Sequence, residues 1–188
     1  MFDEVTDVLL QPGAVAVIPT DTVYGLVARA ADEAAVQRLF EIKKRDAKPG
    51  TLIAASIDQV EALGFKRRYL TAVQQYWPGA VSVVIPAADP ALKYLHRGKM
   101  SVAVRIPKDL ELHKLLERTG PLMTSSANDP GQPTAATAQA AKDYFGDQVD
   151  IYVDGGDLSD RQPSTVIRIV DDAIEILREG AVKISENE

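Results

Sequence analysis

The sequence predicts an α/β protein: a mixed, twisted parallel and antiparallel sheet that is flanked by helices. Short apolar stretches typical of buried strands alternate with amphipathic, capped helical segments through the first two thirds of the chain. The last third changes to short strand patterns with tight connections, which favours antiparallel pairing there. We therefore expect a single domain over residues 1–188, a length that can bury a sizeable core.

Breaks and caps set the elements of the first half. Pro12 and Gly13 end the first helix, and Asp32 is suited to cap the second. Ser56 and Gln59 form a capping box for the third. The elements expected in this half are helices over residues 3–11, 33–45, 56–63 and 67–76 and strands over residues 14–19, 51–55 and 81–86.

In the second half, Gly120 and Pro121 close a helix, and Thr134 or Thr137 would cap an alanine-rich one. Polar loops follow the strands that end near residues 19 and 126. Because ligands of such sheets tend to bind at the carboxyl ends of strands, we expect a site at these two loops. The other elements expected are a helix over residues 109–119 and strands over residues 101–106, 121–126, 150–156, 164–170 and 173–179.

Composition narrows the class of protein. Hydrophobic residues make up 46% and charged residues 26%, and no apolar run approaches the ~20 residues of a membrane-spanning helix. The N-terminus lacks the positive charge of a secretory signal, and the chain has no cysteine, so we expect a cytoplasmic protein without disulfides or thiolate chemistry. The net charge of −6 argues against binding nucleic acid through the overall field.

Hydroxyls, amides and cations remain as candidates for chemistry, because phosphate-loop, dinucleotide and zinc-protease motifs are absent. Lys43 and Arg45 combine a point charge with a planar fork of donors, which suits polyphosphate. Residues 124–128, TSSAN, add hydroxyls and an amide on a turn. Arg105 ends an apolar strand and needs a carboxylate or an anionic ligand, although a structural acid would also serve. These residues indicate a pocket for a small anion.

Seven stretches of the chain together resemble the YrdC/TsaC family of threonylcarbamoyl-AMP synthases. They are IPTDTVYGL, IKKR, WPGAVSVV, SVAVRIP, TSSAN, PSTVI and ILREGAV, in the family's order over nearly the whole chain. The resemblance implies a twisted YrdC-like α/β fold with a concave basic pocket, in the short bacterial form. It also implies an enzyme that makes threonylcarbamoyl-AMP and pyrophosphate from L-threonine, bicarbonate or CO2, and ATP.

The implied reaction joins the threonine amine to CO2 as a carbamate, whose oxygen attacks the α-phosphate of ATP. Catalysis would come from positioning and charge stabilisation, with Mg²⁺ on the phosphates and no prosthetic group. A separate transferase complex would then pass the threonylcarbamoyl group to the adenosine next to the anticodon of tRNA, and the protein itself could contact tRNA weakly.

The resemblance also assigns residues to roles. Those expected to bind threonine are Thr22, Arg105, Thr124 and Ser164. The catalytic set at the phosphates and carbamate is Lys43, Arg45, Ser126 and Asn128. The residues expected near ATP are Arg45, Lys48, Ser101, Ser126, Thr134 and Arg178. The resemblance leaves Asp21 without a role beyond that of a turn acceptor and names no metal ligand.

One departure from the family pattern affects this assignment. Asp46 stands where the family usually has proline, so the resemblance does not define the path of residues 46–50. Two alternatives stay open. One is an RNA-binding module of the same fold that makes no adenylate, against which the acidic net charge argues. The other is a paralogue that makes a different carbamoyl adenylate, although such proteins carry cysteine-rich zinc modules.

Overall fold

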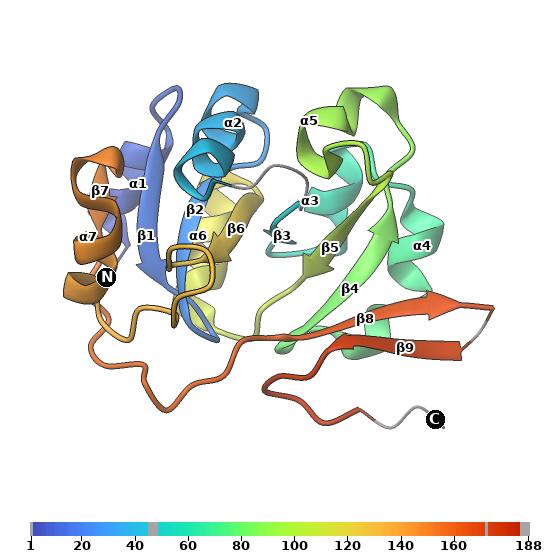
Figure 1. Cartoon of the computed structure of the whole chain (residues 1–188). Coiled ribbons are helices and arrows are strands. Elements are labelled where there is room, and N and C mark those ends of the chain that lie inside the picture. The colour runs from blue at the N-terminus through green and yellow to red at the C-terminus, as the bar shows by residue number, and fades with distance from the viewer. Residues whose placement is uncertain (1, 45–48, 172, 185–188) are drawn as a thin grey trace.

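The computed structural model describes residues 2–44, 49–171 and 173–184. Within these ranges the strands form one nine-stranded sheet in the order β7-β1-β2-β6-β3-β5-β4-β8-β9, with helices on both faces (Figure 1). The strands are β1 (Val15–Pro19), β2 (Tyr24–Arg29), β3 (Thr51–Ile53), β4 (Val81–Pro86), β5 (Ser101–Arg105), β6 (Leu122–Ser126), β7 (Ile151–Tyr152), β8 (Thr165–Val170) and β9 (Ala173–Arg178). The α-helices are α1 (Asp3–Leu9), α2 (Glu33–Ile42), α3 (Ile57–Ala62), α4 (Arg67–Thr71), α5 (Lys93–His96), α6 (Leu110–Thr119) and α7 (Ala138–Phe145).

The predicted mixed sheet is confirmed, but the expected antiparallel pairing of the last strands is only partly right. β8 and β9 pair antiparallel, whereas β7 lies parallel to β1 and β8 lies parallel to β4. The chain therefore leaves β7 at one edge of the sheet and crosses to its far half through residues 153–164, here called the strap (Figure 1). The tight connections visible in the sequence could not show this crossing, because strand pairing depends on distant partners.

Strand β2 is an element that the sequence reading missed. Residues 20–23 do form a polar turn, but Tyr24–Arg29 then returns as a strand antiparallel to β1. Its sequence, YGLVAR, contains a glycine and shows no alternation of polar and apolar residues, because the strand is buried on both faces. The predicted loop after β1 is thus the turn of a hairpin.

Helix caps place most helices where the sequence predicts them. Asp32 accepts a hydrogen bond from the Ala35 amide at 3.0 Å, and Ser56 accepts one from Gln59 at 3.3 Å. Of the two threonines considered for α7, Thr137 is the cap. Several boundaries differ from those expected. Helix α1 ends at Leu9, α2 ends at residue 42, and the segment 67–76 divides into α4 and a short 3-10 turn. The strand expected over residues 150–156 is only Ile151–Tyr152.

The two faces of the sheet carry separate cores. One core packs α2, α3, α4, α5 and α7 against one face, and the other packs α1 and α6 against the opposite face of β1, β2, β3 and β6. This second core includes no residue of β4 or β5. α1 and α6 therefore cover only part of this face of the sheet. None of the described helices is long and apolar enough to span a membrane.

Tyr24 fastens the strap to the hairpin. Its hydroxyl donates to the Gly156 carbonyl at 2.9 Å and accepts from the Gly155 amide at 2.8 Å. The side chain has no exposed surface, and burial raises the pKa of Tyr24 above its ordinary value, so the hydroxyl keeps its proton at neutral pH. One buried group thus satisfies a donor and an acceptor of the strap backbone.

We expect Tyr24→Phe to lower the free energy of unfolding by about 1–3 kcal/mol, because it leaves the two strap groups unpaired without changing the ring. Urea unfolding followed by circular dichroism measures this. Tyr69→Phe is the matched control, since the Tyr69 hydroxyl meets only the exposed side chain of Arg68. Equal stability of the two variants would contradict the role given to Tyr24.

Candidate functional site

A pocket of roughly 320 Å³ opens on the part of the sheet that α1 and α6 leave uncovered. It lies where the turn of the β1–β2 hairpin, the end of β6, the strap and β9 come together. The residues that line it are Thr20, Thr22, Val23, Tyr24, Gly25, Pro49, Gly50, Thr51, Ala103, Arg105, Thr124, Ser125, Ser126, Pro163, Ser164, Val166 and Arg178. Among them two arginines carry charge and none is acidic.

Small residues form the floor of the pocket. Gly25, Thr51, Ala103 and Thr124 come from neighbouring strands and replace the large side chains found under α1 and α6. A Cβ atom on Gly25 would lie 2.6 Å from Thr124 Oγ1, too close for a real contact. Gly25 therefore allows the close approach of β2 to the threonine.

Arg105 ends β5 in a buried ion pair. Its NH2 atom lies 3.0 Å from Asp21 Oδ1 in the hairpin turn, and the two side chains are 4% and 8% exposed. Its NH1 atom donates to Ser82 Oγ of β4 at 3.3 Å. The structural alternative considered for Arg105, pairing with an acid, is thus present. Removing one partner of such a pair costs about 3–5 kcal/mol, because the other charge stays buried.

Ser164 links Arg105 to the second arginine. The Ser82 and Ser164 hydroxyl oxygens lie 2.8 Å apart, and Arg178 of β9 donates through NH2 to Ser164 Oγ at 3.1 Å. Arg178 also holds the Ser164 carbonyl through Nε and NH2. Two guanidinium groups thus reach one wall of the pocket from β5 and β9, connected by two serines.

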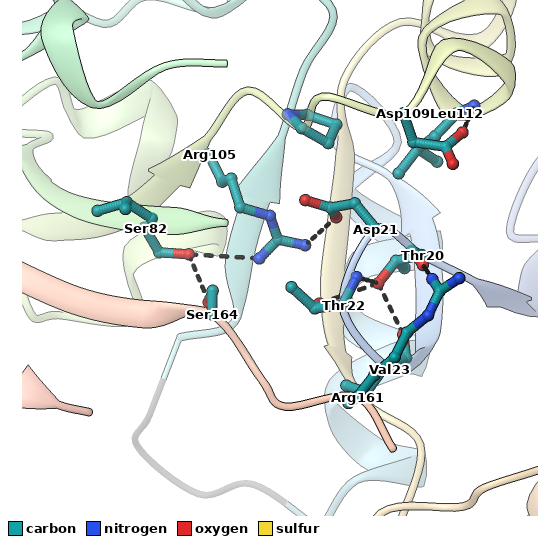
Figure 2. Close-up of polar contacts among 12 residues, drawn as sticks. Thr20, Asp21, Thr22, Val23, Ser82, Arg105, Asp109, Leu112, Arg161 and Ser164 are labelled. Atoms are coloured by element: carbon teal, nitrogen blue, oxygen red, sulfur yellow. Dashed lines mark hydrogen bonds and ion pairs between the residues drawn. The ribbon is translucent and has the colours of Figure 1, made fainter. Parts of the chain in front are cut away.

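The hairpin turn forms the opposite wall. Thr20 Oγ1 lies 3.1 Å from the Thr22 hydroxyl and donates to the Val23 carbonyl at 2.7 Å. Arg161 of the strap donates through NH1 to the Thr20 carbonyl at 3.0 Å (Figure 2). The turn is therefore held from inside by a hydroxyl and from outside by the strap, which fixes Thr22 at the pocket.

Lys43 anchors the loop that follows β6. Its ammonium donates to the Ser126 carbonyl at 2.7 Å, to Asn128 Oδ1 at 3.0 Å and to the Asn128 carbonyl. Ser126 Oγ donates to the same Asn128 Oδ1 at 2.7 Å. Because Lys43 is 3% exposed, it sits behind the pocket wall rather than on its surface. It brings positive charge to this loop and fixes its shape.

The predicted site residues largely converge. The pocket is lined by Thr22, Arg105, Thr124, Ser126, Ser164 and Arg178. Lys43 and Asn128 join it through Ser126. Two predicted ATP residues lie outside the lining. Ser101 is on the same strand face as Arg105 and donates a hydrogen bond to the Lys99 carbonyl. Thr134 is on the loop before α7. Arg45 and Lys48, with Asp46, lie outside the described residues.

The sequence reading missed Asp21 and Ser82. Asp21 was treated as a turn acceptor, whereas the structure pairs it with Arg105. Ser82 is fully buried in an otherwise apolar strand, VSVVIP, and a polar residue at such a position is a signal that could have found it. Neither contact is local, since Asp21, Ser82 and Arg105 come from three separate segments.

Unsatisfied polar atoms gather at this site. Across the described residues, the buried side-chain atoms without a hydrogen-bond partner are Asp21 Oδ2, Arg105 Nε and Ser125 Oγ. Buried polar groups are nearly always paired, so a cluster of exceptions indicates a place that water or a ligand completes. With two arginines and several hydroxyls, the ligand expected here is a small anion.

The same residues do not form a site for a resident metal ion. The described part of the chain holds no group of three or more acidic or histidine side chains within reach of one ion.

The fold and site define an α/β protein with a pocket, lined by two arginines and several hydroxyls, on an uncovered part of one face of its sheet. The family described as "Telomere recombination", which comprises Sua5, YciO and YrdC, matches residues 8–180. The chain belongs to this family, as its sequence motifs predict.

Two curated relatives are named threonylcarbamoyl-AMP synthase. The relative from Pyrococcus abyssi is 34% identical over 186 residues, which is 95% of this chain but 54% of the relative. The one from Pseudomonas syringae pv. syringae is 34% identical over 174 residues, 91% of this chain and 93% of the relative. The chain thus spans about half the length of the first and nearly all of the second.

A solved structure of the family is similar to this chain. It is the crystal structure of P. abyssi Sua5 complexed with L-threonine, with 32% identity and a TM-score of 0.82. The match covers 94% of this chain and 53% of that one. The predicted fold class is confirmed by this likeness.

The two adjacent lysines provide a test of the loop anchor. We expect Lys43→Met to speed hydrogen exchange in the 127–132 loop about tenfold or more, because two oxygens of Asn128 and the adjoining Ser126 carbonyl lose a charged donor. Lys44→Met is the control: its side chain is 72% exposed and reaches the same loop only through a 3.7 Å pair with Asp129. Mass spectrometry of exchanged peptides measures both, and equal exchange in the two variants would refute the anchor.

Proposed function

We propose that this chain is an L-threonylcarbamoyladenylate synthase. Two comparisons support the proposal: relatives at 34% identity are named threonylcarbamoyl-AMP synthase, and a similar structure was solved with L-threonine. The activity stays a proposal for this chain, which spans only part of the Pyrococcus relative.

The observation that carries the proposal is the buried Arg105 beside three pocket hydroxyls. An α-amino acid has a carboxylate that a guanidinium fork can bind, and threonine adds a hydroxyl that needs a polar partner. Thr22, Thr124 and Ser164 supply such partners around Arg105. A pocket near 320 Å³ is large enough to hold an amino acid.

The nucleotide is proposed to lie beside the amino acid, over Arg178 and the loop that holds Ser126 and Asn128. In the first step the lone pair of the threonine amine forms a bond to the carbon of CO2, the electrons of one C=O π bond move to its oxygen, and the nitrogen gives a proton to solvent water, which leaves a carbamate. In the second step a carbamate oxygen bonds the α-phosphorus, and the bond from that phosphorus to the bridging oxygen breaks. Pyrophosphate leaves with the bond electrons. Arg178 and Lys43 would offset the charge that develops.

Mg²⁺ enters this proposal as part of the substrate, bound to the phosphates of ATP, because the described residues form no metal cage. The product would pass to a threonylcarbamoyl transferase complex that modifies the adenosine next to the anticodon of tRNA. A reaction that uses ATP and serves tRNA is expected in the cytoplasm.

The alternatives are weaker on the same observations. An RNA-binding module would need an extended basic surface, whereas the net charge is −6 and the two arginines of the lining are buried or bound to Ser164. A paralogue for another carbamoyl adenylate would share the pocket but not its dependence on threonine. One assay therefore separates all three.

Pyrophosphate release from MgATP is expected only when threonine and bicarbonate are both present. The measurement is a coupled pyrophosphate assay in which each component is omitted in turn. Release that ignores threonine would overturn the substrate, and salt-sensitive tRNA retention without any release would favour the RNA-binding alternative.

Substitution of Arg105 should separate the two substrates. We expect Arg105→Ala to raise the KM for threonine about 30-fold or more and to change the KM for ATP much less, because it removes the carboxylate partner. Arg105→Lys keeps the charge but loses the planar fork, and should fall between. The control is Arg118→Ala, because Arg118 pairs with Asp3 on the surface, away from the pocket lining. Equal losses for both substrates would refute this assignment.

A further inference from the structure

Two residues hold Arg105 from outside the pocket. Asp21 Oδ1 lies 3.0 Å from NH2 and Ser82 Oγ lies 3.3 Å from NH1, yet neither residue belongs to the lining. Ser82 has no exposed surface, and the Asp21 side chain is 8% exposed. A ligand in the pocket therefore meets Arg105 but not the groups that hold it.

The three side chains have a defined arrangement. Figure 2 shows Asp21 and Ser82 on opposite sides of the Arg105 guanidinium, whose terminal nitrogens point toward Thr22 and Ser164. Thr22 and Ser164 both line the pocket. The guanidinium thus presents its edge of two terminal nitrogens to the side where a ligand would lie.

We propose that Asp21 is a positioning residue for the amino-acid carboxylate: it fixes the Arg105 guanidinium so that its terminal edge faces the pocket, with Ser82 supporting the other side. The inference rests on the proposed function, since it concerns the binding of threonine at that same site. An arginine binds a carboxylate best through two parallel hydrogen bonds, so its orientation decides the affinity.

The origin of the three residues strengthens the argument. Asp21 comes from the β1–β2 turn, Ser82 from β4 and Arg105 from β5, so the guanidinium is tied to both halves of the sheet. Asp21 also adjoins Thr22, which means that one short turn would set the arginine and a hydroxyl of the opposite wall together. A purely structural ion pair would not require its arginine to line a pocket.

Positioning and competition by Asp21 predict opposite changes in threonine binding, so the direction of the change tests the proposal. As a counter-charge, Asp21 could compete with the substrate carboxylate for Arg105, in which case its removal would tighten threonine binding. Positioning predicts weaker binding instead, because a released guanidinium loses its fixed orientation.

The first experiment compares Asp21→Asn with Asp58→Asn. Asparagine keeps the shape of Asp21 and one acceptor but removes the charge, and Asp58 is a surface acid paired with the exposed Arg67. With the pyrophosphate assay, Asp21→Asn is expected to raise the KM for threonine about tenfold or more. The kcat and the KM for ATP should change by less than about threefold, and Asp58→Asn should match the wild type.

A second variant and a double substitution complete the test. Ser82→Ala should raise the KM for threonine about fivefold, as expected for one lost hydrogen bond. If Asp21→Asn does not fold, Ser82→Ala provides the test of how the guanidinium is held. In the Arg105→Lys background, Asp21→Asn should add nothing, because its effect acts through the guanidinium fork. A stability role alone would not produce this pattern.

The outcomes are distinct. Tighter threonine binding, equal changes in both KM values, or full additivity with Arg105→Lys would overturn the positioning role while leaving the proposed function intact. An unchanged KM for threonine in both Asp21→Asn and Ser82→Ala would do the same. A wild-type protein that releases no pyrophosphate with threonine would remove the proposed function and, with it, this inference.

Discussion

The buried ion pair between Asp21 and Arg105 is the interaction on which the site depends. It joins the hairpin turn to the end of β5, although β6 and β3 separate the hairpin from β5 in the sheet. Two charges removed from water cost several kcal/mol each, and they persist there only because they meet. Among the described residues, Asp21 Oδ2 and Arg105 Nε have no hydrogen-bond partner, so both atoms can still accept or donate a bond.

The pocket exists because helices cover the sheet unevenly. α1 and α6 pack on part of one face, and small residues such as Gly25 and Ala103 lie on the uncovered part of that face. The strap borders this uncovered part, held to the hairpin by Tyr24 and Arg161 and ending at Ser164. Because the strap crosses the sheet, residues from both ends of the chain reach the same pocket. The two cores pack on the two faces of the sheet.

Local signals predicted the helices well. Asp32, Ser56 and Thr137 cap helices through bonds to amides three residues ahead, and such contacts are visible in a sequence. The strand β2 and the parallel neighbours of β7 and β8 were missed, because burial on both faces removes alternation and pairing partners are remote in the chain. Motif resemblance, rather than periodicity, assigned roles to the predicted residues that line the pocket, which are Thr22, Arg105, Thr124, Ser126, Ser164 and Arg178.

The sequence by itself determined the class of fold, the family, and the residues able to bind an anion: Arg105, the TSSAN loop and the hairpin threonines. The fold class, Arg105 and the TSSAN loop follow from residue type and local spacing, whereas the family and the role of Thr22 follow from the motif resemblance. Only the tertiary structure decided that Asp21 and Ser82 hold Arg105, that Ser164 joins it to Arg178, and that Lys43 lies behind the wall. The reason is physical: charged and hydroxyl groups can pair with many partners, and the twist and crossing of a folded sheet select which ones meet.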